Sequence, residues 1–360
     1  MLPALALALA LALATGPASS SLAGRMDVAV DAAAAHGFAG EVTVGGADVS
    51  TYARAVSTGG RTHRVGQVWR WASVSKQVTA TLVMQEVAAG RLSLDDTLAR
   101  RLPAFSGPAA ARVTLRMLLQ HTSGLPNPDD TPVGAGDVPR FYLRDARGTG
   151  GAADALGFCA GPPKAQPPAA FAYDNCDTIV LGAMLERATG RSFAQLVSER
   201  IARPLRLSSL GVAQGGRPAP RVTPGVGEDG APEPRIVLAT FGPAGALYGT
   251  AADLLAFDRA LMDGRLLPEA ARAEAWRGDP KLGYVALGVW GFEAPLKGCA
   301  GSVRLVERRG EIGGVEVRNL LAPDRGRALV VFADRAGFPF GELWQGNGVG
   351  YDLASAAFCG

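Results

Sequence analysis

The sequence predicts an α/β fold of the α+β type, in which a mostly antiparallel sheet is flanked by helices and interrupted by an inserted helix-rich lobe. Alternating apolar segments, typical of half-buried strands, lie near both ends of the chain. Helical periodicity and loops rich in Pro and Gly fill the middle. The 360 residues are 48% hydrophobic and 19% charged, so the chain can bury a sizeable core. We expect a single unit over 24–360, with its sheet at about 37–72 and 235–360 and the lobe at about 73–215.

The first segment of the chain has the composition of a signal peptide. Residues 2–14 alternate Leu and Ala without a charge, and this run is shorter than the roughly 18 residues that a membrane-spanning helix needs. Small-residue cleavage contexts end at Ala14 and Ala23, and we assign 1–23 to the leader. The alternative is an uncleaved anchor. We expect an exported chain, periplasmic or secreted, with no integral membrane span once mature.

The opening part of the mature chain predicts a short helix followed by a hairpin. Residues 26–35 are rich in Ala and end before a Gly. Two alternating apolar stretches follow, over 38–44 and 49–56, with Gly45-Gly46 between them as a turn signal.

Three further helices are predicted in the middle of the chain. Apolar residues repeat on one face over 74–89, and Gly90 stands where a C-terminal glycine belongs. A second helix covers 115–119 after Thr114 as its N-cap, and a third covers 178–188.

The loops separate these helices from the last strands. Residues 126–168 and 215–234 are rich in Pro and Gly and lack periodicity. The second region contains a formal G-x-G-x-x-G at 225–230, but no strand precedes it and no helix follows, so we do not expect a dinucleotide site. The remaining strands are expected over 283–292, 303–307, 315–321 and 328–333.

The four cysteines suggest disulfides rather than a metal site. Cys159, Cys176, Cys299 and Cys359 form no C-x-x-C pair and lie far from any His, and we expect no metal and no cofactor. Three pairings are possible, and the shorter loops favour Cys159 with Cys176 and Cys299 with Cys359. Four free buried thiols are the alternative.

Two functional classes are disfavoured by composition. The formal net charge is only +3 and the charges are mixed along the chain, so we expect no nucleic-acid partner. The chain has three His and no G-x-S-x-G, which leaves little support for a Ser-His-Asp hydrolase.

Another arrangement can activate a nucleophile here. Ser73 and Lys76 form S-x-x-K at the start of a predicted helix, so one helical turn brings the amine beside the hydroxyl. Backbone N–H groups at the helix N-terminus can stabilise an oxyanion, and burial can lower the pKa of a lysine. In isolation, the motif also fits a solvated helix face.

Two more motifs accompany this one. Tyr173 and Asn175 form Y-x-N in a loop before a helix, and Arg308-Arg309-Gly310 lies on a strand that leads into a Gly-Gly turn. In this order the three motifs resemble those of the penicillin-recognising serine hydrolases, a group that includes class C β-lactamases, D-alanyl-D-alanine carboxypeptidases and related esterases. Other landmarks of the family appear in the same order. Among them are H-T-S-G-L-P, which begins at His121, and the segment 244–254. The resemblance implies a β-lactamase/transpeptidase-like fold and covers about 38–333.

The resemblance also implies residue roles. Ser73 would be the nucleophile, Lys76 its partner, and Tyr173 the general base that returns the proton to the leaving group. Asn175 would bind the amide of the substrate, and the backbone N–H groups of Ser73 and Glu311 would form the oxyanion hole.

The third motif departs from the family pattern. Arg308-Arg309-Gly310 stands where the family has Lys-Thr-Gly or His-x-Gly, so the charge is kept and the hydroxyl that helps bind a substrate carboxylate is lost. Arg308, Gly310 and Glu311 are nevertheless expected to line the substrate site. Alternation along a strand sends Arg308 and Arg309 to opposite faces. Arg309 is then either solvated on the far face, or it binds a substrate carboxylate in a geometry different from that of the family.

The expected protein is an exported serine hydrolase that forms an acyl-enzyme with a D-peptide, β-lactam or ester, and is a monomer acting on a small-molecule, peptide or ester substrate. The alternative is a non-catalytic sensor that keeps the fold. His121 is expected to make a structural hydrogen bond to its loop, and Asp174 is taken to face solvent. Trp69, Trp71 and Tyr248 fit either the core or a substrate wall.

Overall fold

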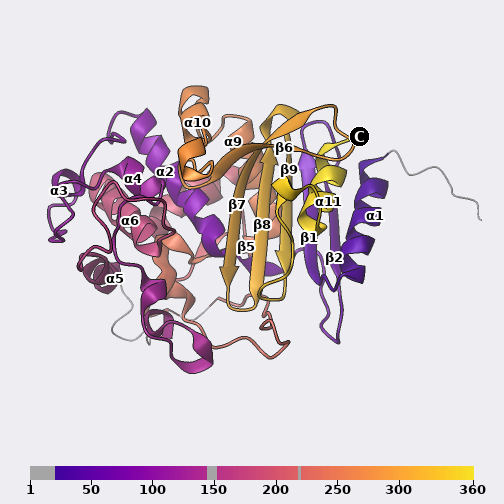
Figure 1. Cartoon of the computed structure of the whole chain (residues 1–360), viewed down its shortest axis with the longest axis horizontal. Helices are drawn as coiled ribbons and strands as arrows, with labels where there is room; N and C mark the ends of the chain where they lie inside the picture. Colours follow the sequence, from indigo (N-terminus) through magenta and orange to yellow (C-terminus); the bar gives the residue numbers. More distant parts are fainter. Residues whose placement is uncertain (1–20, 144–151, 218–219) are drawn as a thin grey trace, which may run out of the picture.

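A six-stranded antiparallel sheet, ordered β2-β1-β9-β8-β7-β6, is the central element of the computed structural model, which describes residues 21–143, 152–217 and 220–360 (Figure 1). Its strands are β1 (Gly40–Gly46), β2 (Tyr52–Val56), β6 (Trp290–Pro295), β7 (Ser302–Ile312), β8 (Val315–Ala322) and β9 (Arg327–Ala333). Strands from both ends of the chain therefore meet in one sheet, as the sequence predicts. The predicted fold class is confirmed.

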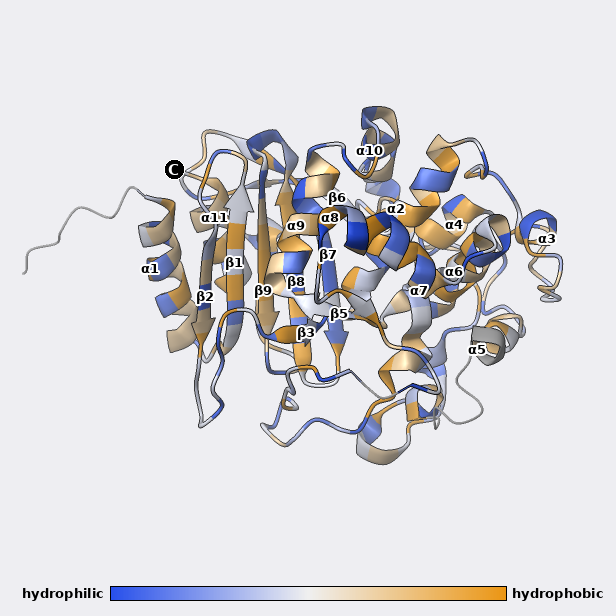
Figure 2. Cartoon of the chain, turned by 180° about the vertical axis from the view of Figure 1, so that it is seen from behind, coloured by the Kyte–Doolittle hydropathy of each residue, from blue (hydrophilic) through white to orange (hydrophobic). Residues whose placement is uncertain are grey.

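Helices cover both faces of this sheet. The terminal helices α1 (Leu22–Ala35) and α11 (Val349–Phe358) lie together on one face, at the right of Figure 1. Helix α9 (Ala251–Met262) packs on the opposite face against β1 and β9. Strand β1 is buried along its whole length, and Figure 2 shows hydrophobic stretches along its ribbon. Val42 and Val44 join the core under α1 and α11. Glu41 is buried on the other face, where its carboxylate accepts hydrogen bonds from Trp69 Nε1 and the Gly66 N–H, as a buried polar group requires.

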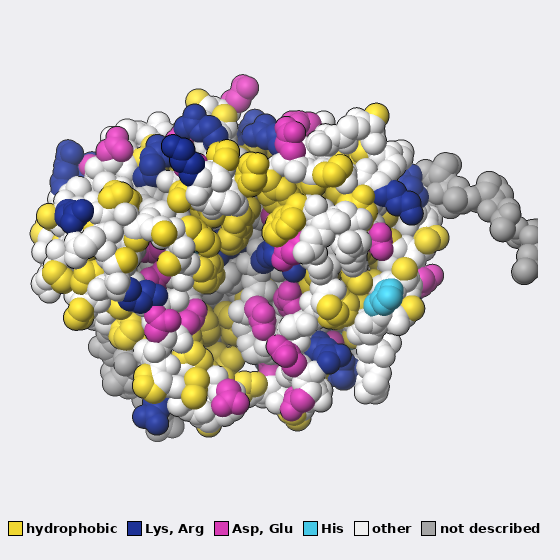
Figure 3. Space-filling model, viewed as in Figure 1, with side chains coloured by type: hydrophobic (Ala, Val, Ile, Leu, Met, Phe, Trp, Pro, Cys, Tyr) yellow, Lys and Arg dark blue, Asp and Glu magenta, His cyan; other side chains and the backbone are white. Residues whose placement is uncertain are grey.

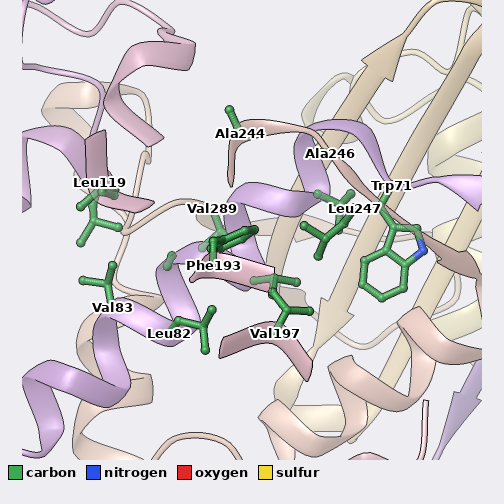
Figure 4. Packing of buried hydrophobic residues seen from close by; sticks show 14 of the residues in the cluster. Trp71, Leu82, Val83, Leu119, Phe193, Val197, Ala244, Ala246, Leu247 and Val289 are labelled. Atoms are coloured by element: carbon green, nitrogen blue, oxygen red, sulfur yellow. The ribbon is translucent and has the colours of Figure 1, made fainter. Parts of the chain in front are cut away.

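The helical lobe lies beside β7 and builds the second part of the core. Its helices are α2 (Ser75–Ala88), α3 (Leu98–Arg101), α4 (Leu115–Leu119), α5 (Ala152–Cys159), α6 (Asn175–Thr189), α7 (Phe193–Val197), α8 (Arg203–Leu205) and α10 (Glu269–Ala275). Figure 4 shows Leu82 and Val83 of α2 among side chains from several other segments of the lobe. Helix α2 is buried on nearly all sides, so residues near its N-terminus are held rigidly.

A small sheet links the lobe to the nucleophile segment. Its order is β3-β5-β4, with β3 (Val68–Arg70), β5 (Leu247–Thr250) and β4 (Gly211–Val212). The chain leaves β3 through Trp71, whose backbone N–H donates to the Leu247 carbonyl at 2.9 Å. This anchors the residues that lead into α2.

One predicted strand is wrong over most of its length. Residues 283–289 form a loop, and β6 begins only at Trp290. Gly283, Tyr284 and Gly288 have φ angles of 65°, 65° and 77°, in the left-handed region that an extended strand excludes. The alternation of apolar residues here reflects a buried loop.

The glycine-rich segment over 225–230 has a structural explanation. Gly225 passes so close to the β7–β8 turn that a Cβ atom would lie 1.9 Å from the Gly314 carbonyl oxygen. Val226 forms isolated bridges with Pro232 and Arg335. The segment is a loop that packs on another backbone, as expected for a motif without a flanking strand and helix.

Both favoured disulfides are present. Cys159 of α5 is bonded to Cys176 of α6, and Cys299 to Cys359 beyond α11. In the described part of the chain, no helix has the length and apolar character needed to cross a bilayer. The proposed leader falls largely outside the described residues. Helix α1 begins at Leu22, so a cut after Ala23 would lie within its first turn.

Candidate active site

Ser73 lies on a tight turn between strand β3 and helix α2. The turn is a 3-10 helix, Ala72–Val74, that runs directly into α2. Ala72 has a φ of 46°, in the left-handed region that costs a non-glycine residue energy, and the surrounding core holds it there. The strained turn leaves Ser73 half-buried and accessible, while its neighbours Ala72 and Val74 are fully buried.

Lys76 is one turn further along and points back to the hydroxyl. Its Nζ lies 3.1 Å from Ser73 Oγ, 2.6 Å from Asn175 Oδ1 and 2.8 Å from the Ala244 carbonyl oxygen. The side chain is 2% exposed. An ammonium has three N–H donors, and each has one acceptor here.

Tyr173 approaches Ser73 from the loop before α6. Its hydroxyl lies 2.6 Å from Ser73 Oγ, and its ring centroid is 4.9 Å from Lys76 Nζ. Asn127 holds this loop from both sides: its Nδ2 donates to the Tyr173 carbonyl at 3.1 Å, and its Oδ1 accepts from the Asn175 N–H at 3.2 Å. The phenol is therefore fixed at hydrogen-bond distance from the nucleophile.

Arg308 of β7 completes this group. Its Nη2 donates to the Tyr173 hydroxyl at 3.0 Å and its Nε to the Ser73 carbonyl at 2.9 Å. Arg309 lies on the other face of the sheet, where its guanidinium contacts the carboxylates of Glu307 and Glu342. The predicted alternation is confirmed: Arg309 lies on the far face as expected, where it is partly buried in ion pairs, and it is not directed into the site.

Gly310 lets strand β7 approach the serine turn. A Cβ at position 310 would lie 2.7 Å from the Ser73 nitrogen and 3.0 Å from Ala72 Cβ, so only glycine lets β7 come this close. The Glu311 side chain is exposed near the end of the strand, on the same face as Arg309.

The electrostatics of the group favour proton transfer. Burial lowers the pKa of Lys76 below its ordinary value, although Tyr173 opposes the effect. Burial raises the pKa of Tyr173, but the cations of Lys76 and Arg308 outweigh it, and the net pKa is lower than that of a free tyrosine. Both pKa values move toward neutral pH, which is the direction that a base acting at neutral pH requires.

The His121 ring packs against the Tyr173 ring and is itself hydrogen-bonded to Asp177. The His121 ring lies 4.9 Å from the Tyr173 ring, and its Nδ1 is 3.0 Å from Asp177 Oδ2. Burial, with Arg308 and Lys76 nearby, lowers the pKa of His121 well below its ordinary value, so the ring carries no charge at neutral pH. The expected hydrogen bond to the loop of His121 is wrong, because the side-chain partner belongs to α6.

Asp174 does not face solvent, contrary to expectation. It is 2% exposed and caps α6, its Oδ1 accepting from the Cys176 N–H at 2.7 Å. A carboxylate in this position pairs with the unsatisfied N–H groups of the helix terminus. Trp69 and Trp71 are fully buried and belong to the core, whereas Tyr248 is half-buried.

Asn175 makes contacts that the sequence did not predict. Besides Lys76, its carboxamide contacts Asp129 and Tyr142. Both of these residues come from the Pro- and Gly-rich region, where no periodicity or spacing indicates a role. Among the described residues, no group of three or more His, Cys, Asp or Glu side chains could hold a metal ion.

Several known proteins are similar to this chain. Penicillin-binding protein 4 of Amycolatopsis lactamdurans is 34% identical over 227 residues, 57% of this chain and 53% of the relative. Esterase EstB of Burkholderia gladioli is 32% identical over 174 residues, 42% of this chain and 40% of the relative. The chain thus spans about half or less of the length of these curated relatives.

The structural comparison covers nearly the whole chain. The crystal structure of a D-stereospecific amidohydrolase from Streptomyces sp. superposes with a TM-score of 0.75 at 25% identity, covering 94% of this chain and 98% of the other. The sequence model of the family described as Beta-lactamase matches residues 23–346. The strained serine turn with its lysine, tyrosine and arginine partners thus lies within the matched region, and the chain belongs to the Beta-lactamase family of penicillin-recognising serine hydrolases.

Proposed function

We propose that this chain is an exported serine hydrolase that works through an acyl-enzyme on Ser73. One observation carries the proposal: Ser73 Oγ lies 2.6 Å from the Tyr173 hydroxyl and 3.1 Å from Lys76 Nζ. A serine hydroxyl is a weak nucleophile without a base, and this arrangement places a base with a lowered pKa beside it. The two disulfides and the apolar leader in the sequence support export, because disulfides persist in oxidising compartments.

The contacts support a definite order of proton transfers. Tyr173 acts as the phenolate, stabilised by Lys76 and Arg308, and accepts the Ser73 proton as Oγ attacks the substrate carbonyl carbon. The oxyanion accepts hydrogen bonds from the backbone N–H groups of Ser73 and Glu311. Tyr173 then gives the proton to the leaving group, and the acyl ester remains on Ser73. In the second half, Tyr173 takes a proton from water as the water oxygen attacks the ester carbon. When the bond between that carbon and Ser73 Oγ breaks, Tyr173 returns the proton to Oγ, and the acid product leaves.

The charges of the cleft support acyl donors without a carboxylate beside the scissile bond. The two cations of the site, Lys76 and Arg308, are 2% and 1% exposed and are held by internal acceptors. Arg309 is occupied on the far face. The carboxylate of Asp129, by contrast, is exposed.

Figure 3 shows the same distribution on the surface. Acidic side chains stand on both sides of the hollow at the centre of this face. A substrate carboxylate would therefore meet like charge and lack the hydroxyl that the family pattern provides. Neutral or cationic esters and amides fit this cleft better than β-lactams or D-alanyl peptides with a free carboxylate.

A matched pair of substrates tests the proposal. A depsipeptide with a free terminal carboxylate and the same compound with a terminal N-methylamide share one ester bond, so the difference in kcat/KM for that ester reports the effect of the carboxylate. We expect faster hydrolysis of the N-methylamide compound and a ratio that shrinks at high salt. Preference for the free acid together with rapid acylation by penicillins would instead indicate a β-lactamase or carboxypeptidase. A stable acyl-enzyme without turnover would indicate a sensor.

A further inference from the structure

The carboxamide NH₂ group of Asn175 is saturated with hydrogen bonds inside the protein. Its Nδ2 donates to Asp129 Oδ1 at 3.0 Å, to Asp129 Oδ2 at 3.2 Å and to the Tyr142 hydroxyl oxygen at 2.7 Å. Its Oδ1 accepts from Lys76 Nζ at 2.6 Å. Asn175 is 5% exposed. A substrate amide would therefore find no free donor on this side chain, and the Asn175 oxygen already accepts from Lys76 inside the protein.

Asp129 fixes the orientation of the Asn175 carboxamide. A carboxylate only accepts hydrogen bonds, so the Asn175 NH₂ group must face Asp129. The reverse orientation would place the amide oxygen against the carboxylate and the NH₂ group against the Lys76 ammonium. Tyr142 reinforces the arrangement, because its hydroxyl donates to Asp129 Oδ1 at 2.5 Å and accepts from Asn175.

We propose that Asp129 and Tyr142 are positioning residues of the acylation machinery, which act through Asn175 to hold the Lys76 ammonium against Ser73. The proposal rests on the proposed function above, and it changes the role of Asn175 from substrate binding to orientation of Lys76. With Asn175 Oδ1 and the Ala244 carbonyl each fixing one N–H of Lys76, the third N–H is directed at Ser73 Oγ.

The charge of Asp129 adds a second effect. The ionisable groups around Lys76 and Tyr173 are Arg308 of β7, His121 after α4, Asp177 of α6, Tyr142 and Asp129. His121 is neutral, and burial raises the pKa values of Tyr142 and Asp177 above their ordinary values, so Asp129 is the anion that balances the two cations from this side. Without this carboxylate the Asn175 carboxamide is no longer held in one orientation, and a Lys76 ammonium that is no longer directed at Ser73 stabilises the Tyr173 phenolate less.

Kinetics of three variants test the proposal on a neutral p-nitrophenyl ester. Asp129→Asn should lower kcat about 10-fold or more with little change in KM, since a small misplacement of a catalytic group is costly. The acidic limb of its kcat/KM profile should move up by at least about 0.5 pH unit. Tyr142→Phe removes a hydrogen bond but keeps the Asp129 carboxylate. Its kcat should therefore fall, while the acidic limb of its kcat/KM profile stays at the wild-type pH.

The matched control is Asp130→Asn. Asp130 is the next residue in the chain and is also exposed, but its carboxylate pairs with Lys164 at 2.8 Å, away from Asn175. This variant should keep the wild-type profile. An effect of Asp129→Asn on KM alone would assign Asp129 to substrate binding and overturn the proposal, as would equal profiles for the Asp129 and Asp130 variants.

A spectroscopic titration separates this proposal from the proposed function. The tyrosinate absorbance of the protein minus that of its Tyr173→Phe variant reports the Tyr173 pKa whether or not the protein hydrolyses anything. Asp129→Asn should raise that pKa, and Asp130→Asn should leave it unchanged. A raised Tyr173 pKa in a protein that never acylates would support the positioning role of Asp129 and refute the proposed hydrolase function. An unchanged Tyr173 pKa in an active enzyme would refute only the positioning role.

Discussion

Replacing Arg308 with alanine tests whether Tyr173 is the base. The Arg308 guanidinium bridges three segments, donating to the Tyr173 hydroxyl at 3.0 Å, the Ser73 carbonyl at 2.9 Å and the Gly288 carbonyl at 3.4 Å. A hydrogen bond to a charged group contributes about 1.5–3 kcal/mol, equivalent to about one to two pKa units. Arg308→Ala should therefore raise the Tyr173 pKa by that amount and lower kcat/KM at neutral pH by about 10- to 100-fold.

The assay is the pH dependence of kcat/KM for a neutral ester. The acidic limb reports deprotonation of the base in the free enzyme, so it should move to higher pH in Arg308→Ala. Arg308→Lys keeps the charge but places all donors on one nitrogen, whereas Arg308 reaches its three acceptors from three different nitrogens. The acidic limb should therefore return to its wild-type position while the rate recovers only in part. A large loss of rate with an unmoved limb would refute Tyr173 as the base.

Arg309→Ala is the matched control for this experiment. Arg309 is adjacent in sequence but lies on the opposite face between Glu307 and Glu342. The variant should keep the wild-type pH profile and lose stability, because the buried Glu307 loses a partner. The reverse pattern, with Arg309→Ala inactive and Arg308→Ala normal, would contradict the strand register described above.

Three further predictions concern the turn, a disulfide and a buried histidine. Gly310→Ala should slow fluorophosphonate labelling by about 100-fold without unfolding, because its Cβ would lie 2.7 Å from the Ser73 nitrogen; normal labelling would contradict the close approach. Replacing Cys159 and Cys176 together with serine should lower the unfolding free energy by about 3 kcal/mol in denaturant titrations, as expected for a loop of 17 residues; an unchanged midpoint and slope would contradict this. His63→Gln should lower the unfolding free energy more at about pH 6 than at about pH 9, because the hydrogen bond between His63 and the buried Asp334 carboxylate raises the pKa of His63. That contribution is complete below the ordinary pKa and disappears as the pH rises through the raised value, so equal losses at both pH values would contradict it.

Local periodicity predicted the parts of the site that depend on one element. The spacing of Ser73 and Lys76 fixes their approach, because one helical turn brings them together in any fold. Strand alternation likewise separated Arg308 from Arg309. The convergence of Tyr173 and β7 on this helix was expected only from the family resemblance, since chain order alone does not place distant segments together.

The predictions that were wrong or missing concern residues whose environment is set by loops and tertiary packing. Asp129 and Tyr142 lie in a region where Pro and Gly interrupt every period, so no pattern indicated that they would meet Asn175. Asp174 stands between two site residues and gives no sequence signal that separates a buried helix cap from a solvated carboxylate. The segment before Trp290 alternates like a strand, but its positive φ angles depend on tertiary packing.

Trapping the acyl-enzyme is the most direct test of the central claim. Intact mass and peptide mapping after exposure to fluorophosphonate and to an activated ester should show one adduct per chain, carried by the peptide that contains Ser73. Ser73→Ala should show none while keeping the melting temperature of the parent protein. An equal adduct on the Ser73→Ala variant, or an adduct mapped to another serine, would contradict the assignment of Ser73 as the nucleophile.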